Sequence, residues 1–364
     1  MDFILLLIMA SFGLSLRYRS SGPNAADLDR QTTMTINGLL LLLVVFSHFM
    51  TYIALPVHFA KLTQVWMLVK GQLIVTTFLF FSGYGIYVQL KKRGRPYLKT
   101  FPKHRLLFLW SKFALAVTLY LMIALMTKRA LTLPHVLLSY LGLATIGNSA
   151  WYIFIILFLY VLTYFAWELF PTNHRQAVGF IVLGCLVYML IANWLLPEYY
   201  ANTVFCYVAG MGYAHYKVVI ERVVCRNWMR YLLVGLSALV IFAASYLICA
   251  QTSGLVRLVS YQIAGVMFAF CFVWLTMRFN IRNPVLAYIG GPAMFSIYIL
   301  QRIPMMGLQQ TGLVNRPVSY FISVLGLTLL LGWLFDKGTR VLWLHSFGRS
   351  KQASKVEVKP LSHH

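Results

Sequence analysis

The feature that most constrains this chain is a series of apolar stretches, each long enough to cross a lipid bilayer as a helix. A hydrocarbon core about 30 Å thick requires roughly 20 apolar helical residues. Ten stretches approach or exceed that length: 35–56, 66–89, 105–126, 151–170, 176–196, 201–216, 231–251, 255–277, 284–307 and 318–336. Hydrophobic residues make up 60% of the chain and charged residues only 11%, whereas about a quarter of the residues in a soluble domain carry charge. The sequence therefore predicts an all-α, polytopic membrane helix bundle of about ten core transmembrane helices.

A further apolar stretch, Phe3 to Leu16, lies at the N-terminus and is short for a membrane span. Arg17 and Arg19 follow it, and their long side chains can reach an interface and lengthen the segment. A cleaved signal peptide is the alternative, but the stretch lacks the basic region that precedes the apolar part of such peptides. We predict a retained short helix whose N-terminus lies outside.

The basic residues are distributed by side. Of the 31 Lys and Arg residues, 23 fall in alternate gaps between the predicted spans, and only four fall in the other gaps. Cytoplasmic loops of membrane proteins carry the excess of Lys and Arg. The sequence therefore predicts a multi-pass protein of the cell membrane with the basic gaps, including residues 91–105, and the C-terminus in the cytoplasm.

The stretch Leu131–Gly147 is apolar but short, and it contains Pro134, His135 and Gly142. If it crossed the membrane, the basic gap 217–230 and the basic C-terminal tail would lie outside, against the observed rule for cytoplasmic loops. We predict instead a re-entrant or interfacial segment at the outer face.

The chain divides into three parts on this interpretation. Residues 1–30 form the short N-terminal membrane helix and a basic loop, residues 31–337 the transmembrane domain, and residues 338–364 a basic, disordered cytoplasmic tail. The net charge of +23 lies at the ends of membrane helices, which favours anionic membrane lipids as partners and argues against nucleic acid. The five cysteines have no CxxC spacing, so we expect neither a disulfide framework nor a metal site.

Ionisable and polar groups inside membrane spans are rare and mark candidate functional residues. His48 lies about 13 residues from the cytoplasmic start of its span, which places it in the outer half. We expect it to share that half with further cations, polar groups and aromatic residues: Lys70, Arg257, Gln301, Arg302, Asn148, Ser149, Trp151 and Tyr152. Such a cavity would fit an anionic or polyhydroxyl ligand, or an oxyanion formed in a reaction. The alternatives are a His48 satisfied by a neighbouring helix, and Lys70 and Arg257 side chains that only extend to the surface.

A second group of cations lies toward the inner side. Lys103 and Arg105 open one span, Lys112 lies two turns further in, and Ser82 to Tyr84 approach the inner end of another. Converging cations and small residues could bind phosphates, although helix-end cations also follow from the positive-inside rule alone. None of the eight acids, Asp336 included, is predicted to lie deep in the membrane, which weakens a cation-coupled transporter.

Several blocks of residues resemble, in order, the signatures of the acyltransferase 3 family, integral membrane enzymes that acylate cell-surface sugars and related molecules. The run from Asn37 and Gly38 to Phe46, Ser47 and His48 resembles its first signature helix, and Phe80 to Tyr84 its Phe-Phe-x-Ser-Gly-Phe block. Lys103–Leu107 resembles the basic start of the following helix, Trp151 and Tyr152 a Trp-Phe helix start, and Gly290–Leu300 with Ser296 and Tyr298 a late Gly, Ser, Tyr-Leu segment. The resemblance covers roughly residues 30–337.

Two positions depart from the family's pattern. The family usually carries Arg eleven residues before the His, where this chain has Asn37. It commonly carries His after the Tyr-Leu pair, where this chain has Gln301, followed by Arg302. These changes could indicate an unusual substrate, a different donor or lost activity.

The resemblance implies an O-acyltransferase that moves an acyl group, most often acetyl, from cytoplasmic acyl-CoA to a hydroxyl of a cell-surface glycan or lipid-linked acceptor. His48 would act as general base, and Arg302 or Lys70 would stabilise the oxyanion; a covalent acyl-histidine stays open. Acyl-CoA would be held by Lys103, Arg105, Lys112 and Tyr84, and the acceptor by Asn37, Trp151, Tyr152, Gln301 and Tyr298. If transfer needs a second, extracellular protein, we expect that partner to be a separate chain.

Two other functions are compatible with the sequence. A transporter or flippase could move an anionic or lipid-linked substrate through the cationic cavity, and a catalytically inactive membrane partner would fit the changes at Asn37 and Gln301. Acyl-CoA hydrolysis or acyl transfer separates the enzyme from both.

Overall fold

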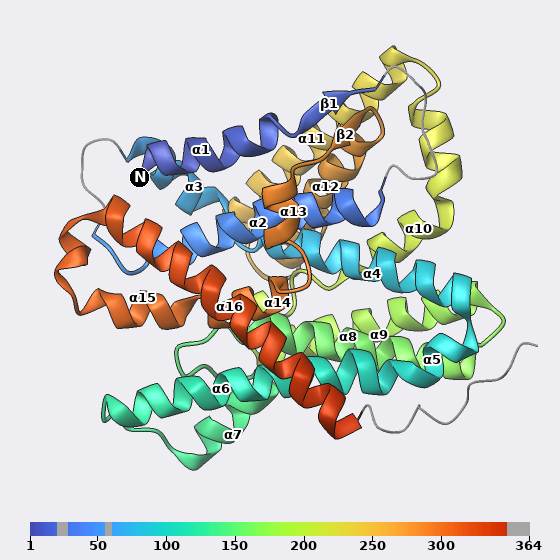
Figure 1. Cartoon of the computed structure of the whole chain (residues 1–364). Coiled ribbons are helices and arrows are strands. Elements are labelled where there is room, and N and C mark those ends of the chain that lie inside the picture. The colour runs from blue at the N-terminus through green and yellow to red at the C-terminus, as the bar shows by residue number, and fades with distance from the viewer. Residues whose placement is uncertain (20–27, 55–59, 348–364) are drawn as a thin grey trace, which may run out of the picture.

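The computed structural model describes residues 1–19, 28–54 and 60–347, and the chain within them is almost entirely helical (Figure 1). The helices are α1 Asp2–Gly13, α2 Arg30–Phe49, α3 Lys61–Val69, α4 Leu73–Arg93, α5 Arg95–Phe101, α6 Phe108–Met126, α7 Leu133–Leu141, α8 Trp151–Leu169, α9 His174–Leu195, α10 Phe205–Val224, α11 Trp228–Gln251, α12 Gly254–Thr276, α13 Pro284–Ile289, α14 Met294–Leu300, α15 Arg302–Gln309 and α16 Pro317–Phe347. A π-helical segment, Pro102–Leu107, joins α5 to α6. Two short antiparallel strands, β1 Leu16–Tyr18 and β2 Phe279–Ile281, complete the fold. The predicted all-α membrane bundle is thus confirmed as a class.

Eight helices are long and apolar enough to cross a membrane: α2, α4, the run Arg95–Met126 that contains α6, α8, α9, α11, α12 and α16. The helix α10 is as long as several of these, but its second half carries Lys217, Glu221 and Arg222. At nine residues, about 14 Å, α7 is too short to span a bilayer, as expected for Leu131–Gly147. These helices make the chain a multi-pass membrane protein.

The span predicted at 284–307 is not one helix. The chain breaks at Gly290 to Pro292, between α13 and α14, and again at Gln301, between α14 and α15. Pro304 lacks the N–H that the carbonyl of Leu300 would accept in a continuous helix. The hydroxyl of Tyr120, from α6, donates to the carbonyl of Ile299 at 3.0 Å. Side chains of other helices therefore replace part of the missing backbone hydrogen bonding.

The predicted tail also begins too early. The helix α16 continues to Phe347, so residues 338–347 are helical and belong to the bundle. The predicted disorder after them falls on residues 348–364, which lie outside the described residues.

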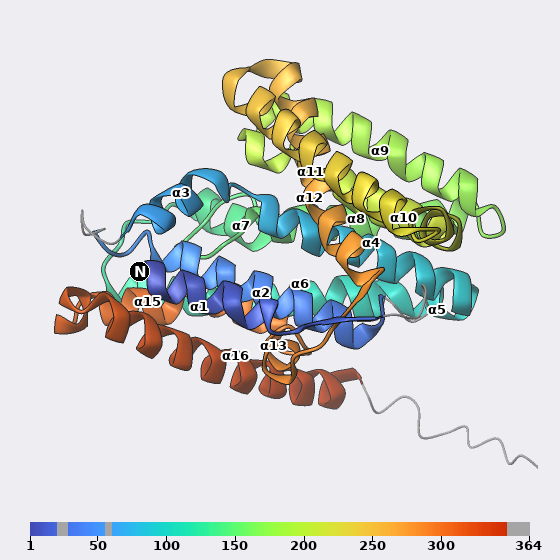
Figure 2. The ribbon, with the colours of Figure 1, turned by 90° about the horizontal axis from the view of Figure 1, so that it is seen from above.

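The helix α2 lies at the centre of the arrangement, with α1, α4, α13 and α14 against it (Figures 1 and 2). Gly38 allows α13 to approach α2 directly, since a Cβ atom there would collide with the carbonyl of Leu286. Gly83 does the same for α4 and α10, because its missing Cβ would meet the carbonyl of Tyr207. Small residues at such crossings are characteristic of helix packing in membranes.

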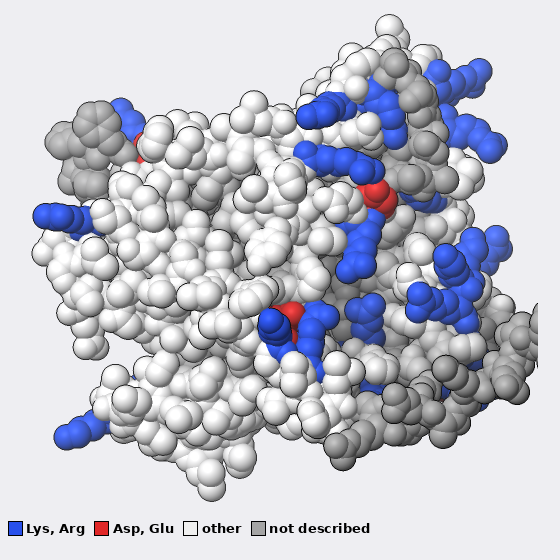
Figure 3. Space-filling view, viewed as in Figure 1, with Lys and Arg blue, Asp and Glu red and all other residues white. Residues whose placement is uncertain are grey.

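The charges lie mostly at one end of the bundle. Figure 3 shows Lys and Arg gathered at the right of this face and a broad uncharged region across the rest of it. At that end α2 begins with Arg30 and α4 closes with Lys91, Lys92 and Arg93 (Figure 1). We call this the basic end; the N-terminus lies at the opposite end.

Candidate active site

Three cavities follow one another along α2. The inner cavity, about 570 Å³, lies toward the basic end and is lined by residues that include Arg30, Asn37, Tyr84, Arg105 and Tyr298. The middle cavity, about 90 Å³, is lined by His48, Lys70, Trp151 and Tyr298, among others. The outer cavity, about 350 Å³, is lined by His48, Arg129, Asn148, Trp151 and Arg302, among others. Tyr298 borders the first two cavities, and His48 and Trp151 border the last two.

His48 is the last residue but one of α2, and it faces the middle and outer cavities from the end of that helix. Gln301 contacts its ring, and the charges of Arg302 and Lys70 act on it. Its Nδ1 atom is buried and has no hydrogen-bond partner within the described residues. Buried polar atoms are nearly always paired, so a free ring nitrogen beside two cavities is available for a proton of a bound molecule.

The helix end that carries His48 is held from two sides. The indole N–H of Trp66, in α3, donates to the hydroxyl of Ser47 at 2.9 Å. The carboxylate of Asp2, in α1, accepts from the backbone N–H and the hydroxyl of Thr63 at 2.9 and 2.7 Å. The chain thus uses α1 and α3 to fix the wall of the middle cavity.

Lys70 lies in the turn between α3 and α4, outside the eight long apolar helices. The turn is fixed by the phenolic oxygen of Tyr261, which accepts from the backbone N–H of Gln72 at 2.6 Å. Burial, and then the positive charge of Arg302, lower the pKa of Lys70. Both effects disfavour a second positive charge in the same space.

Gln301 and Arg302 are placed by the break between α14 and α15. Gln301 is fully buried, and its amide nitrogen donates to the carbonyl of Tyr298 at 2.9 Å. The Nε atom of Arg302 is buried without a hydrogen-bond partner in the described part of the chain. Within residues 1–19, 28–54 and 60–347, no carboxylate lines the middle or the outer cavity.

The inner cavity combines cations with aromatic and amide groups. Arg105 lies on the π-helical segment, where its Nε donates to the hydroxyl of Tyr97 at 3.2 Å. Such irregular helical turns occur frequently at functional sites. Asn37 and Tyr152, predicted to bind the acceptor beside His48, line this cavity instead.

Three predicted cations lie away from the cavities. Lys103 and Lys112 do not line the inner cavity. Arg257, expected beside His48, is bound by both carboxylate oxygens of Glu198 at 2.7 and 2.9 Å. The structure therefore separates these residues from the groups with which the sequence associated them.

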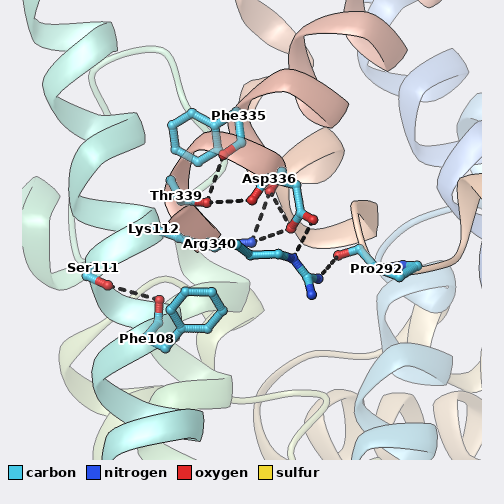
Figure 4. A network of polar contacts seen from close by, with 9 residues as sticks. Phe108, Ser111, Lys112, Pro292, Phe335, Asp336, Thr339 and Arg340 are labelled. Atoms are coloured by element: carbon cyan, nitrogen blue, oxygen red, sulfur yellow. Dashed lines mark hydrogen bonds and ion pairs between the residues drawn. The ribbon is translucent and has the colours of Figure 1, made fainter. Parts of the chain in front are cut away.

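Lys112 is buried in an ion pair with Asp336 of α16 (Figure 4). Arg340 donates to the other carboxylate oxygen at 2.7 Å and also reaches the carbonyl of Pro292 at 3.4 Å. We call Lys112, Asp336 and Arg340 the charge network. The prediction that all acids are peripheral is wrong for Asp336 and also for Glu221, which is buried and accepts from the hydroxyl of Tyr213 at 2.7 Å.

The comparison with protein families identifies the chain. A family model described as an acyltransferase domain, that of the acyltransferase 3 family, matches residues 36–337, most of the chain. The chain belongs to the acyltransferase 3 family. No curated protein and no solved structure matches it. The protein is therefore a membrane acyltransferase, which decides between the enzyme and the transporter.

The site of this acyltransferase contains residues that the sequence did not single out. Arg129, in the turn after α6, lines the outer cavity, and Arg30, Gln89 and Tyr160 line the inner one. Arg129 and Arg30 look like ordinary helix-end cations in the sequence, and no local signal distinguishes them. Tyr160 accepts or donates a hydrogen bond with Ser82 at 2.8 Å, within the predicted Ser82 to Tyr84 block.

Proposed function

We propose that the acyltransferase moves an acyl group, typically acetyl, from acyl-CoA bound in the inner cavity to a hydroxyl of a glycan or lipid-linked acceptor bound in the outer cavity. The observation that carries this proposal is the position of His48, which borders the middle and outer cavities, with Tyr298 linking the middle cavity to the inner one. A donor and an acceptor bound at opposite ends would meet beside this ring.

The inner cavity supports the binding of a phosphorylated donor. Arg30 and Arg105 line it together with Tyr84 and Gln89, and guanidinium groups bind phosphates in a bidentate manner. Asn37 lines this cavity and lies eleven residues before His48 on α2, which corresponds to about 16 Å along the helix. A thioester at the end of a long arm suits that distance, with the phosphates at the basic end.

His48 supports the chemistry of acyl transfer. Its free ring nitrogen takes the proton of the acceptor hydroxyl as the hydroxyl oxygen attacks the thioester carbonyl. Arg302 and Lys70 stabilise the oxyanion of the tetrahedral intermediate. The carbon–sulfur bond then breaks, the thiolate of coenzyme A receives the proton from His48, and the acceptor leaves as an ester.

The direction of transfer follows from the charges. We infer that the basic end lies in the cytoplasm, since cytoplasmic loops carry the excess of Lys and Arg. The C-terminus is then cytoplasmic, the N-terminus outside, and the outer cavity opens to the acceptor at the cell surface. This membrane would be the cell membrane, where both acyl-CoA and surface glycans are accessible.

The test uses the purified protein in liposomes with acetyl-CoA labelled on the acetyl group. Release of free CoA and transfer of label to added membrane glycolipids are followed beside a His48→Ala variant. Loss of a general base lowers the rate about 10²- to 10⁴-fold, while the thermal unfolding temperature should stay close to that of the parent. Equal turnover in both proteins would contradict the proposed role of His48.

A further inference from the structure

We propose that the outer cavity binds its acceptor through a negatively charged group, a carboxylate or a phosphate, carried on a sugar beside the hydroxyl that is acylated. This inference rests on the proposed function for the outer cavity as acceptor site. It adds the chemical class of the acceptor, and it assigns Arg129 and Asn148 as the residues that select it.

The first observation is unbalanced charge. Arg129 and Arg302 line the outer cavity and Lys70 lines the adjoining middle cavity, and none of the three forms an ion pair within residues 1–19, 28–54 and 60–347. Cations in a membrane protein are costly unless an opposite charge accompanies them. A ligand that brings a negative charge would provide the missing partner.

The second observation is how the chain uses its acids. The described ion pairs join Asp336, Glu198 and Asp29 to cations away from the two cavities, namely Lys112, Arg257 and Arg282. Only eight acids occur in the whole sequence. The cations around His48 have thus been left without carboxylates in a chain that pairs several of its other cations.

Arg129 is held at the outer cavity by a defined turn. The backbone N–H of Arg129 donates to the carbonyl of Ala124 at 2.9 Å, and that of Thr127 donates to the carbonyl of Ile123 at 2.9 Å. The turn requires Lys128 to adopt a positive φ of 53°, a conformation that residues other than glycine adopt rarely. Arg129 lines the cavity, whereas its neighbour Lys128 does not.

Asn148 supplies a polar group of fixed orientation. Its side-chain oxygen accepts from the backbone N–H of Ile146 at 3.0 Å. This bond leaves the Nδ2 amide unpartnered in the described residues, although Asn148 is only 5% exposed. An N–H donor of this kind, buried at the cavity wall, is suited to an acceptor oxygen of a bound molecule.

Aromatic side chains complete the cavity. Trp151 and Tyr199 both line it, with ring centroids 6.1 Å apart and ring planes at 62°. An apolar ring beside amide and hydroxyl groups is suited to a sugar, whose faces are apolar and whose edges carry hydroxyls. Together with the two arginines, these residues favour a sugar acid or a sugar phosphate over a neutral sugar.

The experiment measures binding in the absence of donor, with the full-length protein in nanodiscs of zwitterionic phosphatidylcholine. Three probes that differ only at the sixth carbon are compared below the concentrations at which they form micelles: octyl glucoside, octyl glucuronide and octyl glucoside 6-phosphate. For each, the concentration that produces half of the maximal rise in unfolding temperature is determined. At least one anionic probe should act at a concentration at least about tenfold lower than the neutral one, as expected for a charge-assisted hydrogen bond.

The variants Arg129→Gln and Lys128→Gln form a matched pair, since each removes one positive charge from the same turn. The first should abolish most of the preference for the anionic probe, and the second should leave it unchanged. Preference for the glucuronide alone assigns a carboxylate, and preference for the phosphate alone assigns a phosphate. Equal potency of all three probes, no binding of any, or a preference that survives in Arg129→Gln would each overturn the inference.

The same nanodiscs are assayed separately for His48-dependent release of CoA from acetyl-CoA. Because this release needs no sugar probe, it tests the proposed acyl transfer without the acceptor preference. CoA release together with equal probe potencies would refute only the anionic acceptor. A clear anionic preference without CoA release would refute only the proposed chemistry.

Discussion

The charge network and the group around His48 both place cations among apolar helices, but they are balanced in opposite ways. Lys112 is buried against Asp336, which also binds Arg340. His48, Lys70 and Arg302 lie together around two cavities that no described carboxylate lines. A balanced group stabilises the contact between α6 and α16, whereas an unbalanced one is suited to a ligand or a transition state that carries negative charge. The comparison teaches that a buried cation by itself does not mark an active site.

The largest expected effect that separates the two groups is on stability. Asp336→Asn leaves Lys112 buried without a counter-charge, which should lower the free energy of unfolding by about 3–5 kcal/mol. The double variant Lys112→Met with Asp336→Asn should recover most of that loss. Thermal unfolding of the three proteins in nanodiscs measures it; equal stability of Asp336→Asn and the parent would show that the ion pair is not formed.

Arg302→Gln should act in the opposite sense. It removes a cation that has no counter-charge, so the unfolding temperature should stay the same or rise, while acyl transfer falls about 10²- to 10³-fold through loss of oxyanion stabilisation. The rate and the unfolding temperature are measured on the same preparation. A clear drop in stability would indicate that Arg302 has a structural role like that of Lys112.

Arg105→Gln tests which of the inner cations binds the donor. It should raise the acetyl-CoA concentration that gives half-maximal rate about tenfold, through loss of a hydrogen bond to a charged phosphate. Lys112→Met is the control, since Lys112 does not line the inner cavity. A similar increase in both variants would contradict the separation of the charge network from the donor site.

The smallest expected effect is the pH dependence that Lys70 contributes. Its pKa in the folded protein is lowered by burial and by Arg302, so between that pKa and the ordinary value of the unfolded chain, the unfolded state binds more protons. Stability therefore rises with pH through this window. The difference in unfolding temperature between the parent and Lys70→Met should change in favour of the parent as pH is raised from 7 toward 10. A constant difference would contradict the lowered pKa.

The sequence predicted the class of fold because hydrophobic length is a strong signal in membrane proteins. It failed where the signal averages over local detail. The range 284–307 is apolar throughout, and only Gly290 to Pro292 and Pro304 announce that its backbone breaks. Since the break places Gln301 and Arg302, the irregular part of the helix is also the part with the most polar groups at the site.

The site was predictable in part for the same reason. His48, Lys70 and Arg302 stood out as ionisable residues inside apolar stretches, and the structure brings them together. Pairings between distant positions gave no such signal: Lys112 and Asp336 are 224 residues apart in sequence. Asp336 was placed at the end of its span because a charged residue there resembles a helix end. Arg129 was missed because a cation in a loop carries no information about the cavity that it faces.

The narrow middle cavity, with Trp151 and Tyr298 at its wall, has a consequence for the membrane that contains it. At about 90 Å³ it is much smaller than the cavities on either side, and its cations repel other cations, protons included. A protein hollowed from both ends in this way remains an electrical insulator at its centre. The cell can then supply an acyl group to its surface without short-circuiting the voltage across its membrane.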